Sequence, residues 1–401
     1  MREIATADAS LASAAATEPS GVQTRRRMKI ALVVHDYHRS GGHSRYVAEL
    51  ATRYCAEHEV HVFANRIVDD GTSGIHFHHV PAWRANALTT VLSFALPVTL
   101  QVGGGFDIVH CQGFCGFLGN VFTGHMVNQA WHVALKKLGG GETAREAVFN
   151  GIAAALEHSM YRRARHSEVI AVSQRVARDL VEYYQCPARI HVIYHGTDVE
   201  LFSPHTRARL RNEARAKYSV PEGQFVFLYV GNLRKGAKQC MQALARLDQG
   251  VLLCVSPTPA EPYRRFAEEC GVADRVIFAS HTKRVEEAYA AGDALLLPSP
   301  YDPFALVVSE AMGCGLPVVV SREAGVSELI QPGVNGLLLD DMTSDAEWAQ
   351  HMRSLSSDRP WAEALGRAGR KTIEELTWDR VADETLDVYR ALLEKQPQGA
   401  R

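Results

Sequence analysis

The sequence of 401 residues lacks an excess of charge of either sign. Lys and Arg total 43 and Asp and Glu total 45, which gives a net charge of −2. A protein that wraps nucleic acid needs a basic excess, so this balance argues against a nucleic-acid partner. Apolar residues make up 46% of the chain and charged residues 22%. This composition is typical of a globular protein, and the length suits two domains.

Paired cysteines and a signal-like apolar core are also missing. The eight cysteines form no C-x-x-C pair, so we expect reduced thiols in a cytoplasmic protein. Cys111 and Cys115 lie among histidines, but their spacing is not that of a zinc site. Residues 1–27 end in three arginines and are expected to be a disordered extension. The apolar run that follows, 30–34, has the length of a strand rather than of a signal core.

A continuous membrane span is absent as well. The longest mostly apolar stretch, 87–102, is interrupted by threonine, serine, proline and glutamine. It falls short of the ~20 residues that a membrane span requires. We therefore predict a buried or interfacial helix there.

Short β-branched runs alternate with helical periods along the chain, which predicts parallel sheets covered by helices. The expected strands are 29–34, 59–64, 76–80, 107–111, 120–123, 168–172 and 190–194, and then 224–230, 251–255, 275–279, 294–297, 317–320 and 336–339.

The two series of strands predict two doubly wound α/β domains facing across a cleft. We assign residues 28–204 to an N-terminal domain and 205–376 to a C-terminal domain, with the link in the polar stretch 197–217. Helices are expected at about 345–357 and 361–376. A last helix, from Trp378 to about Lys395 within the segment 377–401, is expected to return to the N-terminal domain before a short tail.

In such sheets ligands bind outside the carboxyl ends of the strands, so the loops there are informative. Gly41 and Gly42 follow the first strand and precede a helix, an arrangement that allows close approach of an anion. The loop is neither G-x-G-x-x-G nor a Walker A loop. After strand 224–230, the segment 231–236 places Arg234 and Lys235 before a helix, where two cations suit a diphosphate.

The third loop carries two carboxylates. Asp302 lies in the loop after strand 294–297, and Glu310 follows seven residues further on, inside a predicted helix. The loop carboxylate can hold sugar hydroxyls, the helix carboxylate can accept both hydroxyls of a ribose, and the amides at 304–306 open toward a phosphate.

The block from Asp302 to Gly336 resembles the donor-binding signature of the family-4 retaining glycosyltransferases of GT-B architecture. That signature is an acid, seven residues, Glu-Ala-Met, a Gly-x-Pro-Val turn, a Gly/Glu turn and Gly-x-Asn-Gly. Segments 170–173 and 195–204 resemble the family's link region, and 231–236 its diphosphate loop. Within the family the chain looks nearest to bacterial enzymes that glycosylate lipopolysaccharide core and other envelope glycans.

The resemblance implies a role for each matching residue. Glu310 would bind the donor ribose, Arg234 and Lys235 would neutralise the diphosphate, and Asp302 would hold the sugar. The other donor-binding positions that it implies are Gly41, Gly42, Gly231, Asn232, Ser280, His281, Val285, Phe304, Ala305 and Leu306, with the turn at 280–285 holding the base.

Three positions depart from the family pattern. Asp302 is one methylene shorter than the usual Glu, and Asn232 stands where many members have Arg. The N-domain His-x-His pattern reads His110-Cys111-Gln112, whereas His125 fits another recurrent position. We retain His110 and His125 as catalytic candidates and expect that only one of them lies beside the sugar.

The resemblance implies a retaining transfer from a nucleotide sugar, UDP-linked first and GDP-linked second, to a glycan or lipid-linked acceptor. No D-x-D triplet occurs in the sequence. We therefore expect no metal or other cofactor. The acceptor class suggests envelope polysaccharide or lipopolysaccharide synthesis. The localisation expected is cytoplasmic, with peripheral contact at the inner membrane face suggested by residues 87–102 and by Arg162, Arg163 and Arg165.

Two other functions remain open at this point. A GT-B nucleotide-sugar epimerase would use the same two domains without an acceptor, and free epimerised sugar would reveal it. A non-enzymatic two-domain sugar-binding protein is the alternative of a different class, which the cations of the phosphate type argue against.

Overall fold

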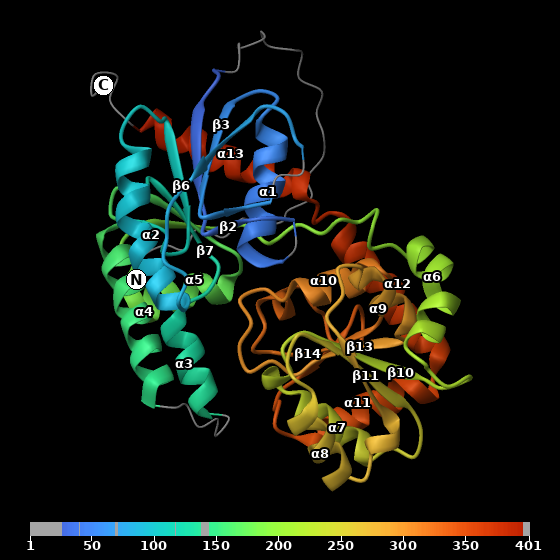
Figure 1. Ribbon diagram of the computed structural model, residues 1–401. Coiled ribbons are helices and arrows are strands. Elements are labelled where there is room, and N and C mark those ends of the chain that lie inside the picture. The colour runs from blue at the N-terminus through green and yellow to red at the C-terminus, as the bar shows by residue number, and fades with distance from the viewer. Residues whose placement is uncertain (1–25, 40, 69–70, 117, 138–143, 396–401) are drawn as a thin grey trace, which may run out of the picture.

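The computed structural model describes residues 26–39, 41–68, 71–116, 118–137 and 144–395. Except for residues 26 and 27, the extension expected at 1–27 lies outside these ranges. Two α/β domains stand one above the other, with the N-terminal domain at the top of Figure 1. Each contains one parallel sheet, as the sequence predicts, and the predicted strands are found with ends shifted by at most one or two residues.

The N-terminal sheet has seven parallel strands in the order β5-β3-β1-β6-β7-β8-β9. They are β1 (Lys29–Val33), β3 (Glu59–Ala64), β5 (Ile75–His79), β6 (Ile108–Gln112), β7 (Val121–Gly124), β8 (Glu168–Ala171) and β9 (Arg189–Val192). A separate pair, β2 (Asp36–Tyr37) with β4 (Arg66–Ile67), was not predicted, because two-residue strands carry no periodic signal.

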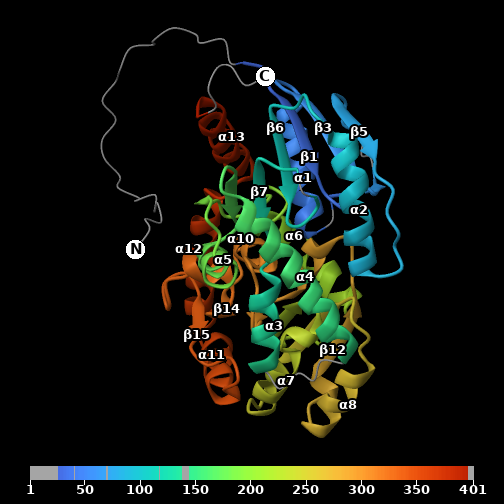
Figure 2. The same cartoon turned by 90° about the vertical axis from the view of Figure 1, so that its left-hand side faces the viewer.

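Alternate side chains of each strand point to opposite faces of this sheet. In β1, Ile30 and Leu32 pack toward α1 (Gly42–Tyr54) and α13 (Trp378–Glu394). Ala31 and Val33 pack toward the other face. Covering that face are α2 (Ala87–Val102), α4 (Ala144–Arg163) and α5 (Gln174–Tyr184), and α3 (Asn128–Lys137) pairs with α4 (Figures 1 and 2).

The C-terminal sheet has six parallel strands in the order β12-β11-β10-β13-β14-β15. They are β10 (Val226–Val230), β11 (Val251–Ser256), β12 (Val276–Ser280), β13 (Ala294–Leu297), β14 (Val318–Ser321) and β15 (Leu337–Leu339). The order of the strands reverses at β1 in one sheet and at β10 in the other. In open α/β sheets of this kind, ligands generally bind at such switch points, outside the carboxyl ends of the strands.

Helices cover both faces of this second sheet. They are α6 (Pro204–Lys217), α7 (Ala237–Ala245), α8 (Glu261–Glu269), α9 (Val285–Ala291), α10 (Leu306–Gly313), α11 (Asp345–Ser357) and α12 (Arg359–Glu374), with the 3₁₀ turns η1 (Leu233–Lys235), η2 (Ala273–Arg275) and η3 (Gly325–Leu329). Helix α12 begins two residues earlier than predicted, since the Asp358 side chain caps it by accepting from the amide of Trp361 at 3.0 Å.

The polar stretch 197–217, expected to be the link, is only partly a link. From Pro204 onward it is helix α6, capped by the Ser203 hydroxyl, which accepts from the amide of Thr206. Arg211 and Arg215 of this helix pair with Asp293 at 2.6 and 3.3 Å. The arginines that suggested a solvated link therefore fix α6 to the C-terminal domain.

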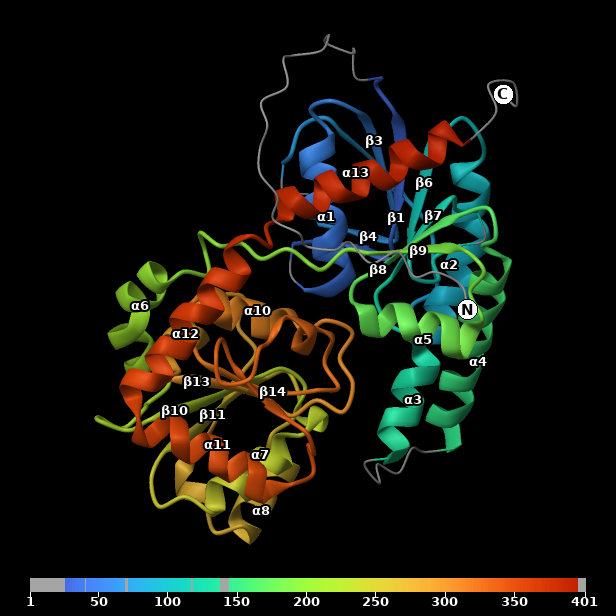
Figure 3. The same ribbon diagram turned by 180° about the vertical axis from the view of Figure 1, so that it is seen from behind.

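The chain crosses between the domains twice, and the two crossings touch. The amide of Thr197 in the first crossing donates to the carbonyl of Leu376 in the second at 2.7 Å. Gly196 lies so close that a Cβ there would be 2.7 Å from the backbone of Trp378. After this crossing, α13 packs on α1 of the N-terminal domain, where the Tyr54 hydroxyl donates to the carbonyl of Ala382 at 2.8 Å (Figure 3).

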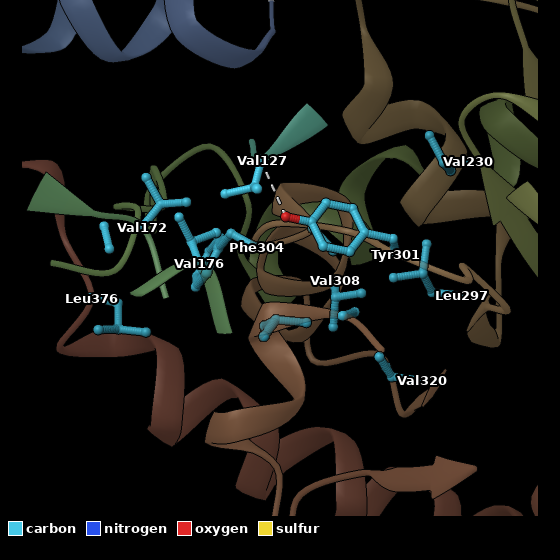
Figure 4. Close-up of a cluster of buried hydrophobic side chains, with 14 of the residues drawn as sticks. Val127, Val172, Val176, Val230, Leu297, Tyr301, Phe304, Val308, Val320 and Leu376 are labelled. Atoms are coloured by element: carbon cyan, nitrogen blue, oxygen red, sulfur yellow. Dashed lines mark hydrogen bonds between the residues drawn. The ribbon is translucent and has the colours of Figure 1, made fainter. Parts of the chain in front are cut away.

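An apolar cluster joins the domains beside these crossings. Val127, Val172 and Val176 of the N-terminal domain pack with Phe304 and Val308 of the C-terminal domain (Figure 4). The amide of Val127 also donates to the Tyr301 hydroxyl at 3.3 Å. Burial of these side chains holds the carboxyl edge of one sheet against that of the other.

Among the described residues, no helix combines the length and apolarity needed to cross a bilayer.

Candidate active site

The predicted diphosphate loop and the acidic loop meet at the carboxyl edge of the C-terminal sheet. The Lys235 ammonium lies 2.9 Å from a carboxylate oxygen of Asp302 and 5.5 Å from the ring centre of Trp131, which belongs to α3 of the other domain. Gly236, which follows Lys235, has φ 106°, and a Cβ there would lie 2.3 Å from the carbonyl oxygen of Pro298. This close approach presses the cationic turn against the loop that carries Asp302.

The backbone at the start of α10 is strained. Ala305 has φ 71° and ψ 70°, the left-handed conformation that costs an L-residue roughly 1–2 kcal/mol. The amide of Val326 donates to the carbonyl of Phe304 at 2.9 Å, and the amide of Phe304 donates to the Asp302 carboxylate at 3.3 Å. These hydrogen bonds fix the segment 304–306 at the N-terminus of α10. Backbone strain of this kind is concentrated at functional sites.

Glu310 of α10 is a buried carboxylate held from both domains. One oxygen accepts from the guanidinium of Arg45 in α1 at 3.0 Å, and the other accepts from the Tyr289 hydroxyl of α9 at 2.7 Å. Burial raises the pKa of Glu310 and the charge of Arg45 opposes that rise. Arg45 lies four residues after Gly41, so the predicted glycine loop and the predicted ribose carboxylate are brought together.

His125 lies in a stack of imidazoles beside this loop. Its ring centre is 4.2 Å from that of His43 and 5.4 Å from that of His195. Its Nε2 pairs with the Gln112 amide oxygen at 2.7 Å, while its Nδ1 has no hydrogen-bond partner. Burial lowers the pKa of His195 to about 3, and it lowers the pKa of His125 as well. At neutral pH these rings are uncharged and can bond sugar hydroxyls.

The structure corrects the prediction for His110. This side chain is 0% exposed, and its Nδ1 and Nε2 lie 2.6 Å from the hydroxyls of Tyr389 and Thr123. Burial lowers its pKa to about 3. With both ring nitrogens bonded inside the domain, His110 is a core residue that joins the sheet to α13. It has no free ring nitrogen to offer a substrate, which leaves His125 as the candidate histidine of the site.

The remaining predicted residues lie on neighbouring loops. Gly231, with φ 132°, follows β10, and the Asn232 side chain caps η1 by accepting from the amide of Arg234 at 3.0 Å. Arg234 is exposed. Ser280 and His281 are exposed at the end of β12, and Val285 begins α9. The structure thus gives Asn232 a capping role, and the turn predicted to bind the base follows β12 of the same sheet.

A metal site is not apparent from the described side chains. Within those ranges, no group of three or more His, Cys, Asp or Glu residues is placed to hold an ion. Cys115 lies 3.4 Å from His35 Nδ1 but also bonds the carbonyl of Gln112 at 2.9 Å.

The Gly/Glu turn of the motif connects the two domains. The Glu328 carboxylate accepts from the amides of Gln174 and Arg175 at 2.9 and 2.7 Å, which caps α5 of the N-terminal domain. The Ser173 hydroxyl donates to the carbonyl of Pro303 at 2.6 Å. A Cβ on Gly325 would lie 2.1 Å from that same carbonyl oxygen, so only glycine fits.

Sequence reasoning assigned no role to Arg45, Tyr289, Trp131 or Glu328. Arg45 follows the predicted glycine loop by three residues and Glu328 lies in the motif block 302–336, but nothing in the sequence indicated their partners. Trp131 gave no local signal, because its role depends on α3 lying along the C-terminal domain (Figure 2).

Two facing Rossmann-like domains, with cations and carboxylates at opposed carboxyl edges, define a nucleotide-sugar glycosyltransferase of GT-B type. The chain belongs to the GT-B glycosyltransferases: residues 40–201 match the family described as "Glycosyltransferase Family 4", and residues 211–372 match "Glycosyl transferases group 1".

The names of similar proteins agree with this assignment, and similar solved structures share the fold. A D-inositol 3-phosphate glycosyltransferase of Xylanimonas cellulosilytica is 31% identical over 242 residues, which are 57% of this chain and 58% of that relative. An alpha-maltose-1-phosphate synthase of Mycolicibacterium smegmatis is 27% identical over 90% of this chain and 99% of its own. Sucrose-phosphate synthase from Thermosynechococcus elongatus has a TM-score of 0.77 at 24% identity, covering 92% of this chain and 100% of that one.

The glycosyltransferase WaaG, described as involved in lipopolysaccharide biosynthesis, has a TM-score of 0.73 at 22% identity, covering 90% of this chain and 99% of its own. The matches therefore confirm a GT-B glycosyltransferase but do not single out the lipopolysaccharide-core type that the sequence resemblance favoured.

The close approach at Gly325 yields a stability prediction. Gly325→Ala drives a methyl group into the Pro303 carbonyl and Ser173, so we expect a loss of about 1–3 kcal/mol in unfolding free energy, as for other overpacked sites. Gly151→Ala is the control, because Gly151 is exposed on the surface of α4 and a Cβ there would meet open space. Alanine at this position should raise the unfolding free energy by up to about 1 kcal/mol. The melting temperatures of both variants and of the wild type test this prediction. Equal melting of Gly325→Ala and wild type would show that the interdomain contact is not fixed.

Proposed function

We propose that this enzyme transfers a sugar, with retention of configuration, from a UDP-sugar, or second from a GDP-sugar, without a metal ion. The observation that carries the proposal is the grouping of Lys235, Asp302 and Glu310 around the strained start of α10. Retention is carried over from the family resemblance. Glu310 would accept hydrogen bonds from the ribose hydroxyls. Its two oxygens each hold one protein donor and retain further acceptor capacity.

Charge explains the role proposed for Lys235. Breaking the anomeric bond places negative charge on the leaving diphosphate, and fixed cations lower that barrier. Lys235 now pairs with Asp302. In the complex, Lys235 would pair with the diphosphate instead of Asp302, and Arg234 and the amides at 304–306 would also bind the phosphates. Asp302 and His125 would bond the sugar hydroxyls. Two cations can supply the positive charge that a divalent ion supplies elsewhere.

For the base we propose the turn that contains Ser280, His281 and Val285. This turn follows β12, which is separated from β10 by one strand, so all these groups share one sheet edge.

The donor assignment predicts a specific change in thermal stability. UDP should raise the melting temperature of the wild type more than GDP does, because ligand that binds only the folded state stabilises it. Glu310→Ala should abolish the gain, since the ribose loses its carboxylate partner. Glu384→Ala, which removes a half-buried carboxylate that pairs with Arg380 on α13, should keep it. Glu310→Gln tests folding, because its amide oxygen can still accept from Arg45. A Glu310→Ala enzyme that UDP stabilises as well as the parent would contradict the ribose assignment.

The catalytic assignment predicts an effect on turnover rather than on donor binding. With saturating UDP-sugar and EDTA present, the wild type should turn over, and Lys235→Ala should lower kcat by ~10²–10³, the usual cost of one transition-state contact. Lys238→Ala is the matched control, because that lysine lies on α7 with its ammonium 4.6 Å from the ring centre of Phe266.

Two results would overturn parts of this account. A kcat of Lys235→Ala within about threefold of the parent would remove its catalytic role, on the scale where tenfold is ~1.4 kcal/mol. Complete loss of wild-type activity in EDTA, restored by Mg²⁺ or Mn²⁺, would remove the metal-independent mechanism.

For the acceptor we propose an envelope glycan or its lipid-linked precursor, met at the inner face of the membrane. The support is an apolar line on α2, where Leu92, Leu96 and Leu100 are 47%, 64% and 73% exposed. They recur every four residues and so share one helix face. Exposed Arg162 and Arg163 end α4, which lies on the same flank (Figures 1 and 2). Apolar and basic surfaces together suit anionic membranes.

The acceptor proposal predicts that the protein floats with anionic liposomes at low salt. Leu96→Ser with Leu100→Ser should reduce the floated fraction severalfold because burial in the interface is lost, whereas Val334→Ser, at another exposed apolar residue, should not. If the protein does not float with the liposomes, the proposal that it meets its acceptor at the membrane is wrong. Transfer of sugar to soluble inositol 3-phosphate would then favour a phosphorylated small-molecule acceptor, which the names of the relatives suggest.

A further inference from the structure

A cavity of about 580 Å³ lies on the C-terminal domain, away from the catalytic edge. Phe225, Asp293 and Pro317 line it, and they immediately precede β10, β13 and β14. The cavity therefore opens at the amino ends of the strands, opposite the loops that carry Lys235 and Asp302. Its walls are α6 and α12, which lie side by side in Figures 1 and 3.

Cations outnumber carboxylates in this cavity. The lining cations are Arg207, Arg211, Arg359, Arg367, Arg370 and Lys371, and the lining acids are Asp293, Glu363 and Glu374. Each acid is already matched: Asp293 by Arg211 at 2.6 Å, Glu374 by Arg370 at 2.8 Å and Glu363 by Arg367 at 3.7 Å.

Three cations remain without a carboxylate partner among the described residues. Arg207 donates to the carbonyl of Gly292 at 3.1 Å, but its buried Nε has no hydrogen-bond partner. Arg359 donates to the carbonyl of Gly223 at 3.3 Å and lies over the Phe225 ring. Lys371 is exposed at the rim. Burial lowers the pKa of Arg207, and the neighbouring charge of Arg211 adds to this effect.

A phosphate group would satisfy this arrangement. Guanidinium forks pair with phosphate oxygens in two parallel bonds, and a Lys ammonium adds a point charge. The volume lies within the range of small-molecule sites. Ala208, Phe225, Pro317 and Ala362 give part of the wall an apolar surface, so the ligand can carry an organic body as well as a charged end.

The cavity also touches the elements that position the donor site. Helix α10 follows the strained residue Ala305 and ends at Gly313, directly before Cys314 and Gly315, which line the cavity. Arg370 donates to the carbonyls of Val199, Phe202 and Gly313, two in the interdomain crossing and one at the end of α10. A ligand beside Arg370 would therefore lie next to the end of the helix that carries Glu310 and would be linked to the crossing through the Arg370 side chain.

We propose that this cavity is a second ligand site, separate from the donor site, that binds a phosphorylated small molecule of sugar-phosphate size. The inference goes beyond the proposed function and does not depend on it.

The experiment measures binding of glucose 6-phosphate by calorimetry, in the presence of saturating UDP, with glucose as the uncharged control. We expect glucose 6-phosphate to bind and glucose not to bind. Arg359→Ala with Lys371→Ala should weaken binding about tenfold or more, because each removes a charged contact. Both side chains are exposed, so the variant should fold. Lys371→Arg should retain binding, and so should Arg390→Ala, which removes an exposed charge from α13.

Lys235→Ala separates the two sites. If it leaves glucose 6-phosphate binding intact, the ligand is not in the donor site. No binding to wild type, equal binding to the Arg359→Ala, Lys371→Ala variant, or loss of binding in Lys235→Ala would each overturn the proposal. None of these outcomes bears on whether UDP binds at Glu310, which is measured separately.

Discussion

The ion pair between Arg45 and Glu310 is the contact on which the site depends. A carboxylate that is only 6% exposed keeps its charge only with a partner, and that partner comes from the other domain. The glycine loop places Arg45 at the first turn of α1, and the strained turn at Ala305 places Glu310 inside α10. Each domain supplies one member of the pair. The carboxylate that we propose for donor binding is therefore paired with Arg45 only when the domains face one another as they do here. The proposed donor binding at Glu310 would therefore be coupled to the domain arrangement through this ion pair.

The family motif combines chemistry with mechanical support. Asp302 and Glu310 are the carboxylates that we propose for substrate contact, but Glu328 caps a helix of the other domain and Gly325 is required by the close approach of Pro303. Asn232 likewise caps the cationic turn. Residues of one short sequence signature thus serve three purposes, and only geometry separates those that can touch a substrate from those that hold the domains together.

Much of the architecture could be predicted because buried strands and amphipathic helices leave recognisable patterns of apolar residues in the local sequence. Parallel strands buried on both faces appear as apolar runs, and all thirteen strands of the two sheets were anticipated. Loops after strands directed attention to Lys235, Asp302 and Glu310. The failures concern contacts between distant residues. His110 looked catalytic, but its partner Tyr389 lies 279 positions away on α13. The charged segment that forms α6 looked like a link because its acidic partner, Asp293, lies far along the chain, directly before β13.

The measurement that tests this account most directly is a crystal structure of the enzyme with bound UDP. The account predicts both ribose hydroxyls within hydrogen-bond distance of the Glu310 carboxylate, with the diphosphate beside Lys235 and the amides of 304–306. A nucleotide whose ribose lies away from Glu310, or whose diphosphate occupies the cavity between α6 and α12, would contradict it.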